Sequence, residues 1–273
     1  MTCAQLKPLM LSIFSSFFIK GLKVIFHDHN SIKKHQWGRF YRYVCRKYVD
    51  SWICVSNEIK ISAKKFVDEE KLYFVNNPVD TDKYYFNKNE RNNHLQRFAL
   101  IANYRQEKNH ELLIESLLKI NIENLVVDCF GSYLSTAYGK SIIDYVREKE
   151  MAGKINILGP SNEIHKLLDY YDVGLLVSKD EGLPITLLEY MSKGLPVAVP
   201  NVGQCKDIVD SANCGIVFKK NDVASLSDAI LEILDNKDRW RLWGRNGRKY
   251  VKENHSIYNF GNKINDIYNQ SKK

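Results

Sequence analysis

The chain has 273 residues, of which 44% are hydrophobic and 26% are charged, and its formal net charge is +8. This balance is typical of a soluble globular protein with one large domain or two small ones, and it excludes a largely disordered chain. The excess of Lys and Arg predicts a surface that attracts anions such as phosphates, nucleic acid or an acidic membrane leaflet.

The first apolar segment, residues 9–19, is too short to span a bilayer, and no convincing signal-peptide cleavage site follows it. We therefore expect a helix that packs under a sheet. The six cysteines lie far apart, and no pair has the CxxC spacing of a zinc or redox site. This pattern favours reduced thiols in the core of a cytoplasmic protein.

Strand-like and helix-like segments then alternate along the chain, which predicts an α/β fold with parallel sheets covered by helices on both faces. Helices are predicted over residues 111–120, 141–150 and 225–234, and residues 238–270 read as further helices with aromatic anchors. The predicted strands are residues 23–26, 51–55, 72–75, 98–101, 125–130, 155–158, 173–177 and 196–199.

The polar stretch of residues 80–96 interrupts this alternation and marks a linker. We expect residues 1–85 to form a partial N-terminal Rossmann-like domain, because they supply only about three strands and begin with a helix that has no strand before it. Residues 86–96 would be the linker, and residues 97–252 a complete Rossmann-like domain. Residues 253–273 are expected to form a helix that packs back on the first domain.

The most informative segment is residues 178–199, SKDEGLPITLLEYMSKGLPVAV. It follows a buried strand and reads as a polar loop, a helix and a second strand. Pro184 suits the first turn of the helix, and Gly194 suits its left-handed end. In open α/β sheets the ligand crevice lies at a loop of this kind.

A nucleoside diphosphate sugar would suit this loop, because the free N–H groups and the dipole of a helix N-terminus attract a diphosphate. Glu181 in the loop and Glu189 two turns into the helix can both face the crevice, where a carboxylate accepts hydrogen bonds from vicinal hydroxyls. The donor-binding residues expected around the helix start are Gly182, Leu183, Pro184, Ile185 and Thr186.

The segment EGLPITLLE resembles the signature of glycosyltransferase family 4, the retaining GT-B enzymes among the glycosyl transferases of group 1. The similarity runs essentially from Lys23 to Tyr258. It includes KGLPVAVPNVGQCKDIV, FGSY, INILGPSNEIHKLLDYYDVGLLVS, FALIANYRQEKNHELLIESL, VSNEIKISAKKF and VNNPVDTDKY. The resemblance implies a GT-B fold in which the C-terminal Rossmann-like domain is complete and the N-terminal one is partial.

The resemblance also implies roles at matching positions. Glu189 would hold the ribose hydroxyls and Glu181 the transferred sugar, while Arg105 and Lys108 would stabilise the departing diphosphate. Many family members carry Gly-Arg directly after the preceding strand, where this chain has Ala-Asn, so Arg105 would act in a variant form of the motif. Gly131 matches a glycine beside the nucleotide, and a plain tight turn explains it equally well.

A family histidine that reaches the donor sugar corresponds to His27 or His29, with His29 slightly preferred and a plain loop histidine as the alternative. Ser56 matches a small polar residue and would cap the helix that follows. No metal cluster is expected, since Asp169 and Asp172 lie at a helix–strand junction and read as structural. No cofactor is implied beyond the nucleotide-sugar donor.

The resulting hypothesis is a metal-independent glycosyltransferase that moves a hexosyl or N-acetylhexosaminyl group to a saccharide or lipid-linked acceptor in surface polysaccharide synthesis. It would work in the cytoplasm, and the basic surface with its apolar N-terminal helix is compatible with the inner face of the membrane. The alternative is a shortened remnant that binds the nucleotide sugar without transferring it. A nucleic-acid-binding protein is disfavoured, because no helix-turn-helix, zinc-finger or aromatic ribonucleoprotein motif supports it.

Overall fold

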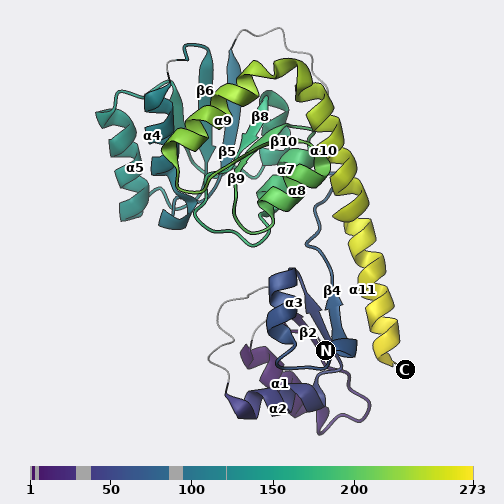
Figure 1. Cartoon of the computed structure of the whole chain (residues 1–273). Coiled ribbons are helices and arrows are strands. Elements are labelled where there is room, and N and C mark those ends of the chain that lie inside the picture. The colour runs from purple at the N-terminus through teal and green to yellow at the C-terminus, as the bar shows by residue number, and fades with distance from the viewer. Residues whose placement is uncertain (1, 4–5, 29–37, 86–94, 121, 273) are drawn as a thin grey trace. The chain divides into compact units, whose positions relative to one another are not determined.

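The computed structural model describes residues 2–3, 6–28, 38–85, 95–120 and 122–272. The chain forms two compact units, one of Met1–Pro78 with Ile257–Lys273 and the other of Val79–Ser256 (Figure 1). Within the described ranges, no helix has both the length and the apolar character that a bilayer span requires.

The first unit contains a parallel sheet in the order β1-β2-β3-β4. Its strands are β1 (Thr2–Cys3), β2 (Ile25–Asp28), β3 (Ser51–Cys54) and β4 (Leu72–Phe74). The helices of this unit are α1 (Leu6–Ser16), α2 (Arg39–Tyr48), α3 (Asn57–Ala63) and α11 (Ile257–Lys272). The Oγ of Ser56 accepts a hydrogen bond from the N–H of Ile59 at 3.2 Å, which confirms the predicted cap of α3.

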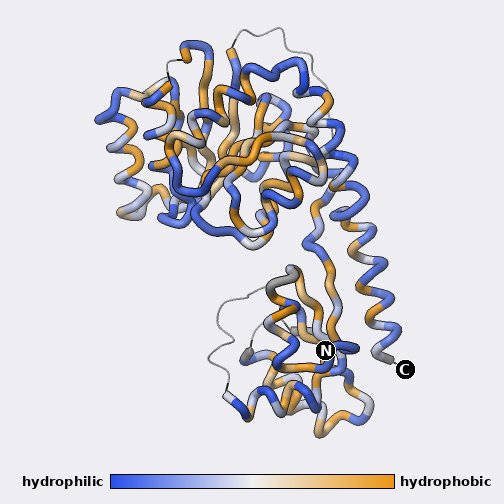
Figure 2. Tube along the Cα trace, in the orientation of Figure 1, coloured by the Kyte–Doolittle hydropathy of each residue, from blue (hydrophilic) through white to orange (hydrophobic). Residues whose placement is uncertain are grey.

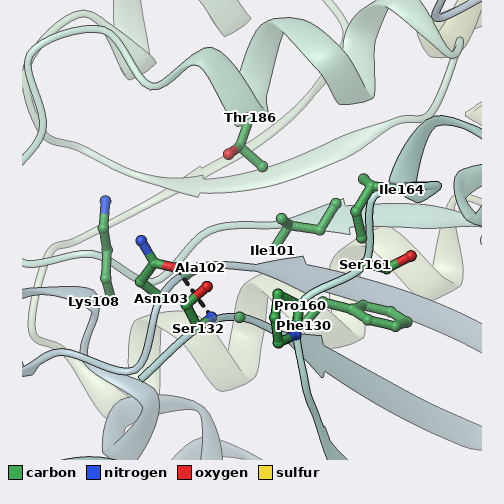
Figure 3. A pocket seen from close by; sticks show the side chains of 11 residues that line it. Ile101, Ala102, Asn103, Lys108, Phe130, Ser132, Pro160, Ser161, Ile164 and Thr186 are labelled. Carbon is green, nitrogen blue, oxygen red and sulfur yellow. Dashed lines mark hydrogen bonds between the residues drawn. The ribbon is translucent and has the colours of Figure 1, made fainter. Parts of the chain in front are cut away.

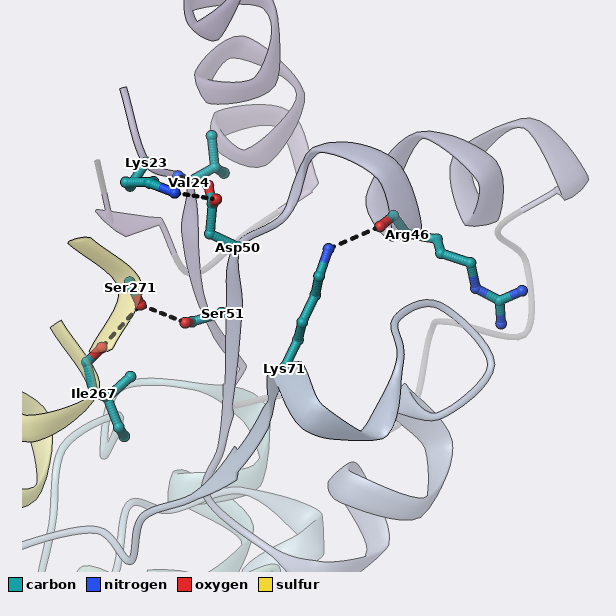
Figure 4. A network of polar contacts seen from close by, with 8 residues as sticks. All are labelled: Lys23, Val24, Arg46, Asp50, Ser51, Lys71, Ile267 and Ser271. Carbon is teal, nitrogen blue, oxygen red and sulfur yellow. Dashed lines mark hydrogen bonds and ion pairs between the residues drawn. The ribbon is translucent and has the colours of Figure 1, made fainter. Parts of the chain in front are cut away.

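Both faces of the first sheet are covered. Trp52 and Cys54 of β3 pack with Leu9 of α1, whereas Ile53, which points to the opposite face, packs with Ile267 of α11. Ser51 Oγ and Ser271 Oγ lie 2.6 Å apart, so a hydrogen bond accompanies the apolar packing of α11 (Figure 4). The C-terminal helix therefore belongs to the first unit.

The second unit contains a six-stranded parallel sheet in the order β10-β9-β8-β5-β6-β7. Its strands are β5 (Gln96–Ile101), β6 (Leu125–Phe130), β7 (Ile155–Leu158), β8 (Val173–Leu175), β9 (Val197–Pro200) and β10 (Gly215–Phe218). The chain leaves β5 toward β6 on one side and later returns to β8 on the other. This reversal creates a topological switch point at the carboxyl ends of β5 and β8.

Helices cover both faces of the second sheet, and hydrophobic residues concentrate along its strands (Figure 2). Phe98 and Leu100 of β5 pack in one core cluster, and the intervening Ala99 packs in the other. The helices are α4 (His110–Lys119), α5 (Ala137–Glu148), α6 (Ile164–Leu167), α7 (Ile185–Ser192), α8 (Cys205–Ala212), α9 (Val223–Asp235) and α10 (Trp240–Asn254).

The structure corrects three expectations. A strand does precede the first helix, since β1 pairs with β2, but two residues are too few to leave a sequence pattern.

The units divide after Pro78, seven residues before the expected boundary at residue 85, because the N–H of Val79 donates to His255 O at 2.8 Å. Pro184 lies just before α7 as its extended N-cap residue, outside the first turn. Residues 86–94 of the expected linker lie outside the described ranges, and Gln96 begins β5.

Candidate active site

Two loops meet at the switch point of the second sheet. One joins β5 to α4 and carries Lys108, and the other joins β8 to α7 and carries Glu181. Because β5 and β8 are hydrogen-bonded neighbours, their carboxyl ends bring the two loops together. The N–H of Lys179 donates to Glu107 O at 2.8 Å, which ties the loops directly to one another.

Lys108 and Glu181 form an ion pair at this point. Lys108 ends the short 3-10 turn Gln106–Lys108, and Asn109 then adopts a left-handed conformation with φ of 57° as the chain enters α4. Ser178 Oγ donates to Glu181 Oε1 at 2.8 Å. Both charged side chains are largely shielded from solvent, so the pair is better defined than an exposed one.

Helix α7 is held close to the sheet, which fixes its N-terminus at the same loop. A Cβ atom added to Gly174 would lie 2.3 Å from Tyr190 Cγ, so the ring of Tyr190 occupies the space above that glycine. The N–H of Ile101 donates to Tyr190 Oη at 2.7 Å, which joins α7 to the end of β5. Gly194 has a φ of 71° after the helix, as its sequence context predicted.

Glu189 lies one turn beyond Thr186 on the same side of α7. Its Oε1 atom accepts a hydrogen bond from Tyr84 Oη at 2.6 Å. Burial raises the pKa of Glu189, and the Tyr84 hydrogen bond and the charge of Lys83 oppose that shift. Burial and the Glu189 contact raise the pKa of Tyr84, which therefore keeps its proton and acts as the donor.

A pocket of about 250 Å³ opens beside these loops (Figure 3). This volume suits part of a small-molecule ligand. In Figure 3 Thr186 projects from α7 on one side, and Lys108 and Asn103 project from the β5–α4 loop on another. The lining residues are Ile101, Ala102, Asn103, Lys108, Phe130, Gly131, Ser132, Pro160, Ser161, Ile164 and Thr186.

Two glycines permit close approaches of backbone around the pocket. A Cβ atom at Gly131 would lie 2.1 Å from Ala102 O, so the turn after β6 fits against the β5–α4 loop only without a side chain. Gly203 has a φ of 48°, and a Cβ atom there would lie 1.9 Å from Glu181 O. Gly131 therefore serves the packing of the loops and also lines the pocket.

The remaining predicted site residues are more scattered. Arg105 is exposed, lies over the ring of Tyr133 at 4.5 Å and pairs with Glu107 at 3.8 Å, and it is outside the set that lines the pocket. Gly182 and Ile185 are exposed beside Glu181 and α7, and Leu183 is half-buried. His27 lies in β2 of the first unit, and His29 lies outside the described residues.

Sequence reasoning missed several groups around the site. Tyr84 lay in a polar stretch that was interpreted as the approach to a linker, so nothing in its surroundings indicated burial. Ser178 was a small polar residue in a loop, and its contact with Glu181 leaves no distinctive spacing. The N–H of Gln204 donates to Gly182 O at 2.9 Å, and its buried Nε2 atom has no hydrogen-bond partner in the described structure.

The two aspartates of the segment that precedes β8 have structural partners. Asp169 pairs with Lys193 at 2.5 Å, and Asp172 Oδ2 accepts from the N–H of Arg97 at 2.8 Å. Among the residues that the structure describes, no group of three or more His, Cys, Asp or Glu side chains is arranged to hold a metal ion.

Two curated proteins to which this chain is similar are longer than it. It is 28% identical over 233 residues to the UDP-Gal:alpha-D-GlcNAc-diphosphoundecaprenol alpha-1,3-galactosyltransferase of Escherichia coli, covering 79% of this chain and 59% of that protein. It is 24% identical over 156 residues to the N-acetyl-alpha-D-glucosaminyl L-malate synthase of Bacillus anthracis, covering 56% and 40%. The chain thus spans about half the length of these relatives.

Solved structures show the same fold. A glycosyltransferase from Rickettsia africae matches with a TM-score of 0.88 at 17% identity, covering 100% of this chain and 76% of that one. HepE from Anabaena, solved in complex with UDP, matches with a TM-score of 0.83 at 13% identity, covering 97% and 76%. The fold is therefore GT-B, as the sequence resemblance implied.

The model of the family described as "Glycosyl transferases group 1" matches residues 82–250 of this chain. This range is more than half of the chain, and it contains Lys108, Gly131, Glu181 and Glu189. The chain belongs to the glycosyl transferases group 1 family.

Proposed function

We propose that this chain transfers a glycosyl group, hexosyl or N-acetylhexosaminyl, from a nucleoside diphosphate sugar to a saccharide or lipid-linked acceptor. Transfer would retain the configuration at the anomeric carbon. The observation that carries the proposal is the Lys108–Glu181 ion pair beside the N-terminus of α7, at the switch point of a parallel sheet. This edge is where such sheets bind nucleotides.

The donor would lie across the pocket. The diphosphate would face the N-terminus of α7 and Lys108, where the helix dipole and the ammonium group both favour negative charge. Glu189 would accept hydrogen bonds from the ribose hydroxyls, and Glu181 from the hydroxyls of the transferred sugar. Gly131 would let the backbone approach the nucleotide closely.

Catalysis would depend on charge stabilisation. As the bond between the sugar and the diphosphate breaks, negative charge grows on the departing phosphate oxygens. Lys108 is already held at this site by Glu181, so its ammonium group is positioned before the reaction begins. Arg105 would assist, and no divalent ion would be needed to neutralise the diphosphate.

The first test is calorimetric titration of the purified chain with UDP, GDP, ADP and CMP in the presence of EDTA. UDP is the first choice, because the Anabaena relative was solved with UDP. Saturable binding of one nucleotide, weakened about 10- to 100-fold in Glu189→Ala, would support the ribose assignment. Binding that is unchanged in that variant would remove Glu189 from the site.

The alternative is a chain that binds the nucleotide sugar and transfers nothing. A transfer assay with the matching nucleotide sugar separates the enzyme from the non-catalytic binder. It measures transfer to a panel of saccharide and lipid-linked acceptors, and also hydrolysis of the donor. Binding of the nucleotide without turnover on any acceptor would favour the alternative.

We also propose that the first unit binds the cytoplasmic face of a membrane that contains anionic lipids. Helix α2, RFYRYVCRKY, has four basic residues and no acidic one. Phe14 of α1 and Phe18, in the turn after that helix, are 60% and 74% exposed, and Phe40 of α2 is 70% exposed. The ring centroids of Phe17 and Tyr48 lie 4.8 Å apart, so the C-terminal ends of the two helices are neighbours. Aromatic and basic side chains together are typical of interfacial membrane contacts.

Vesicle sedimentation tests this membrane proposal. The chain should sediment with vesicles that contain phosphatidylglycerol more than with pure phosphatidylcholine vesicles. A Phe14→Ser/Phe18→Ser double variant should lose most of that binding. Equal partitioning to both vesicle types, or none, would contradict it.

A further inference from the structure

Tyr84 contacts the carboxylate that the proposed function assigns to the ribose. It lies in the segment after the division between the two units, and its backbone is fixed to the second one. Its carbonyl oxygen accepts from Ser192 Oγ at 3.2 Å and from Arg248 Nη1 at 3.0 Å. The N–H of Tyr84 donates to Asp80 O at 3.0 Å. The segment therefore presents the Tyr84 ring to α7 from a defined backbone position.

The Tyr84 hydroxyl occupies only one of the hydrogen-bond acceptor positions of the Glu189 carboxylate. Tyr84 Oη donates to Oε1 of Glu189 at 2.6 Å, a length typical of a charge-assisted hydrogen bond. An ionised carboxylate has about four acceptor positions on its two oxygens. Two ribose hydroxyls can therefore bind Glu189 while the Tyr84 contact persists.

The position of Glu189 agrees with this arrangement. Thr186, one turn earlier on α7, lines the pocket, and so does Ile164 of α6. The ring of His165, the next residue along α6, lies 6.1 Å from the ring of Tyr84. Neither Tyr84 nor Glu189 lines the pocket, and Glu189 lies one helical turn along α7 from Thr186, which does.

We propose that Tyr84 is a positioning residue of the donor site, which orients the Glu189 carboxylate so that it can bind the ribose diol of a nucleoside diphosphate. This inference rests on the proposed function and deepens it, because it assigns a second residue to ribose recognition. The family resemblance gave Tyr84 no role, and its contact with Glu189 joins positions 105 residues apart.

The charges around Glu189 determine how the inference can be tested. Tyr84 and Lys83 face it from the preceding segment, and Tyr190 is its neighbour on α7. Burial raises the pKa of Glu189, and the Tyr84 hydrogen bond lowers it. Without that hydroxyl the pKa of Glu189 rises further, so the carboxyl group takes up a proton at a higher pH. A protonated carboxyl has fewer acceptor positions for the ribose.

The experiment compares Tyr84→Phe with the wild-type chain by calorimetry between pH 5.5 and 8.5. The probes are UDP, GDP and ADP, each paired with its 2′,3′-dideoxy counterpart. Tyr84→Phe should weaken binding of the preferred diphosphate about tenfold near pH 6 and less near pH 8. Binding of its dideoxy counterpart should be unchanged at both, which also reports that the variant is folded.

Three control variants make the comparison specific. Tyr85→Phe makes the same chemical change at an exposed neighbouring residue and should behave as wild type. His165→Gln removes the imidazole near Tyr84, which could itself titrate in this pH range. This variant is compared with wild type and, as a double variant, with Tyr84→Phe. Glu189→Gln should bind the preferred diphosphate weakly at every pH, and its pH profile should be the same with Tyr or Phe at residue 84.

The outcomes separate this inference from the proposed function. If the affinity of Tyr84→Phe for the diphosphate changes with pH in parallel with that of wild type, the inference is overturned. It is also overturned if Tyr84→Phe weakens binding of the diphosphate and of its dideoxy counterpart equally. Either result leaves the donor site intact, provided that Glu189→Gln still weakens binding. If the folded wild-type chain binds none of the three diphosphates, both the proposed function and this inference fail.

Discussion

Lys108 and Glu181, which are 73 residues apart in sequence, form an ion pair where the carboxyl ends of β5 and β8 lie side by side. The two side chains were assigned to different parts of the donor, the diphosphate and the sugar. Their contact means that the proposed donor would place its polar groups beside an ion pair that the fold itself forms.

Replacement of Lys108 by Met should reduce turnover far more than it reduces donor binding. The ammonium group would act mainly on charge that develops as the diphosphate leaves, so we expect kcat to fall by about 10²- to 10³-fold. Steady-state kinetics with the nucleotide sugar identified by titration measures this effect. Lys179→Met, at an exposed lysine in the neighbouring loop, is the matched control. Normal turnover in Lys108→Met would remove Lys108 from the mechanism.

Much of the second unit could be predicted from sequence, because most of its strands are apolar runs followed by turn residues. Strands β6 and β7 have the predicted bounds, and the loop with Glu181 lies between a strand and a helix as expected. Strand β10 was missed, because Gly215–Phe218 is half-buried along most of its length and gives a weak pattern. Its pairing with β9 became visible only in three dimensions.

The Tyr84–Glu189 contact could not be predicted, because local sequence does not show which residues that lie far apart along the chain come together in the fold. Polar residues surround Tyr84, and its burial results from contacts with α7 and α10 that are more than 100 residues away. The hydrogen bond from the N–H of Val79 to His255 O likewise ties the start of this segment to the second unit. Composition indicated a polar connection there, whereas the backbone contacts show where the second unit begins.

The buried ion pair of Lys193 with Asp169 should be a strong determinant of stability. The Lys193 side chain is 2% exposed, its Nζ lies 2.5 Å from Asp169 Oδ1, and it also donates to Tyr85 O at 3.1 Å. Asp169→Asn would leave the ammonium group buried without its counter-charge, at a cost of about 3–5 kcal/mol. Urea denaturation measures this change. Asp210→Asn, which removes the exposed pair with Lys206, should change stability by less than about 0.5 kcal/mol. Similar values for the two variants would contradict the prediction.

Gly131→Ala should disturb both stability and the pocket. The added Cβ atom would lie 2.1 Å from Ala102 O, so the β5–α4 loop must move away from the end of β6. We expect a loss of about 1–3 kcal/mol, together with weaker nucleotide binding, because the same loop carries Lys108. Gly159→Ala is the control, since nothing lies within 4 Å of the Cβ atom that it adds. Thermal melting and calorimetric titration of both variants test the prediction, and unchanged behaviour of Gly131→Ala would refute it.

His110 should make the second unit sensitive to mild acid. Its side chain is 1% exposed and stacks on Tyr104 with ring centroids 4.7 Å apart, and neither ring nitrogen has a hydrogen-bond partner of ordinary geometry among the described residues. Burial lowers the pKa of His110 to about 4, against a weaker opposing influence of the Ala102 carbonyl. The unfolded chain therefore binds a proton at a higher pH than the folded chain does.

The sign of the effect follows from that difference. Above a pH of about 6.5 the imidazole is neutral in both states and adds no pH dependence. As the pH falls from 6.5 toward 4, only the unfolded chain takes up the proton, so the free energy of unfolding decreases, by about 3 kcal/mol at the limit. Urea denaturation at pH 7.5 and pH 5 measures this loss. His110→Phe keeps a ring against Tyr104 and should flatten the dependence, whereas His165→Gln should leave it unchanged. An equally steep loss in His110→Phe would show that other groups cause it.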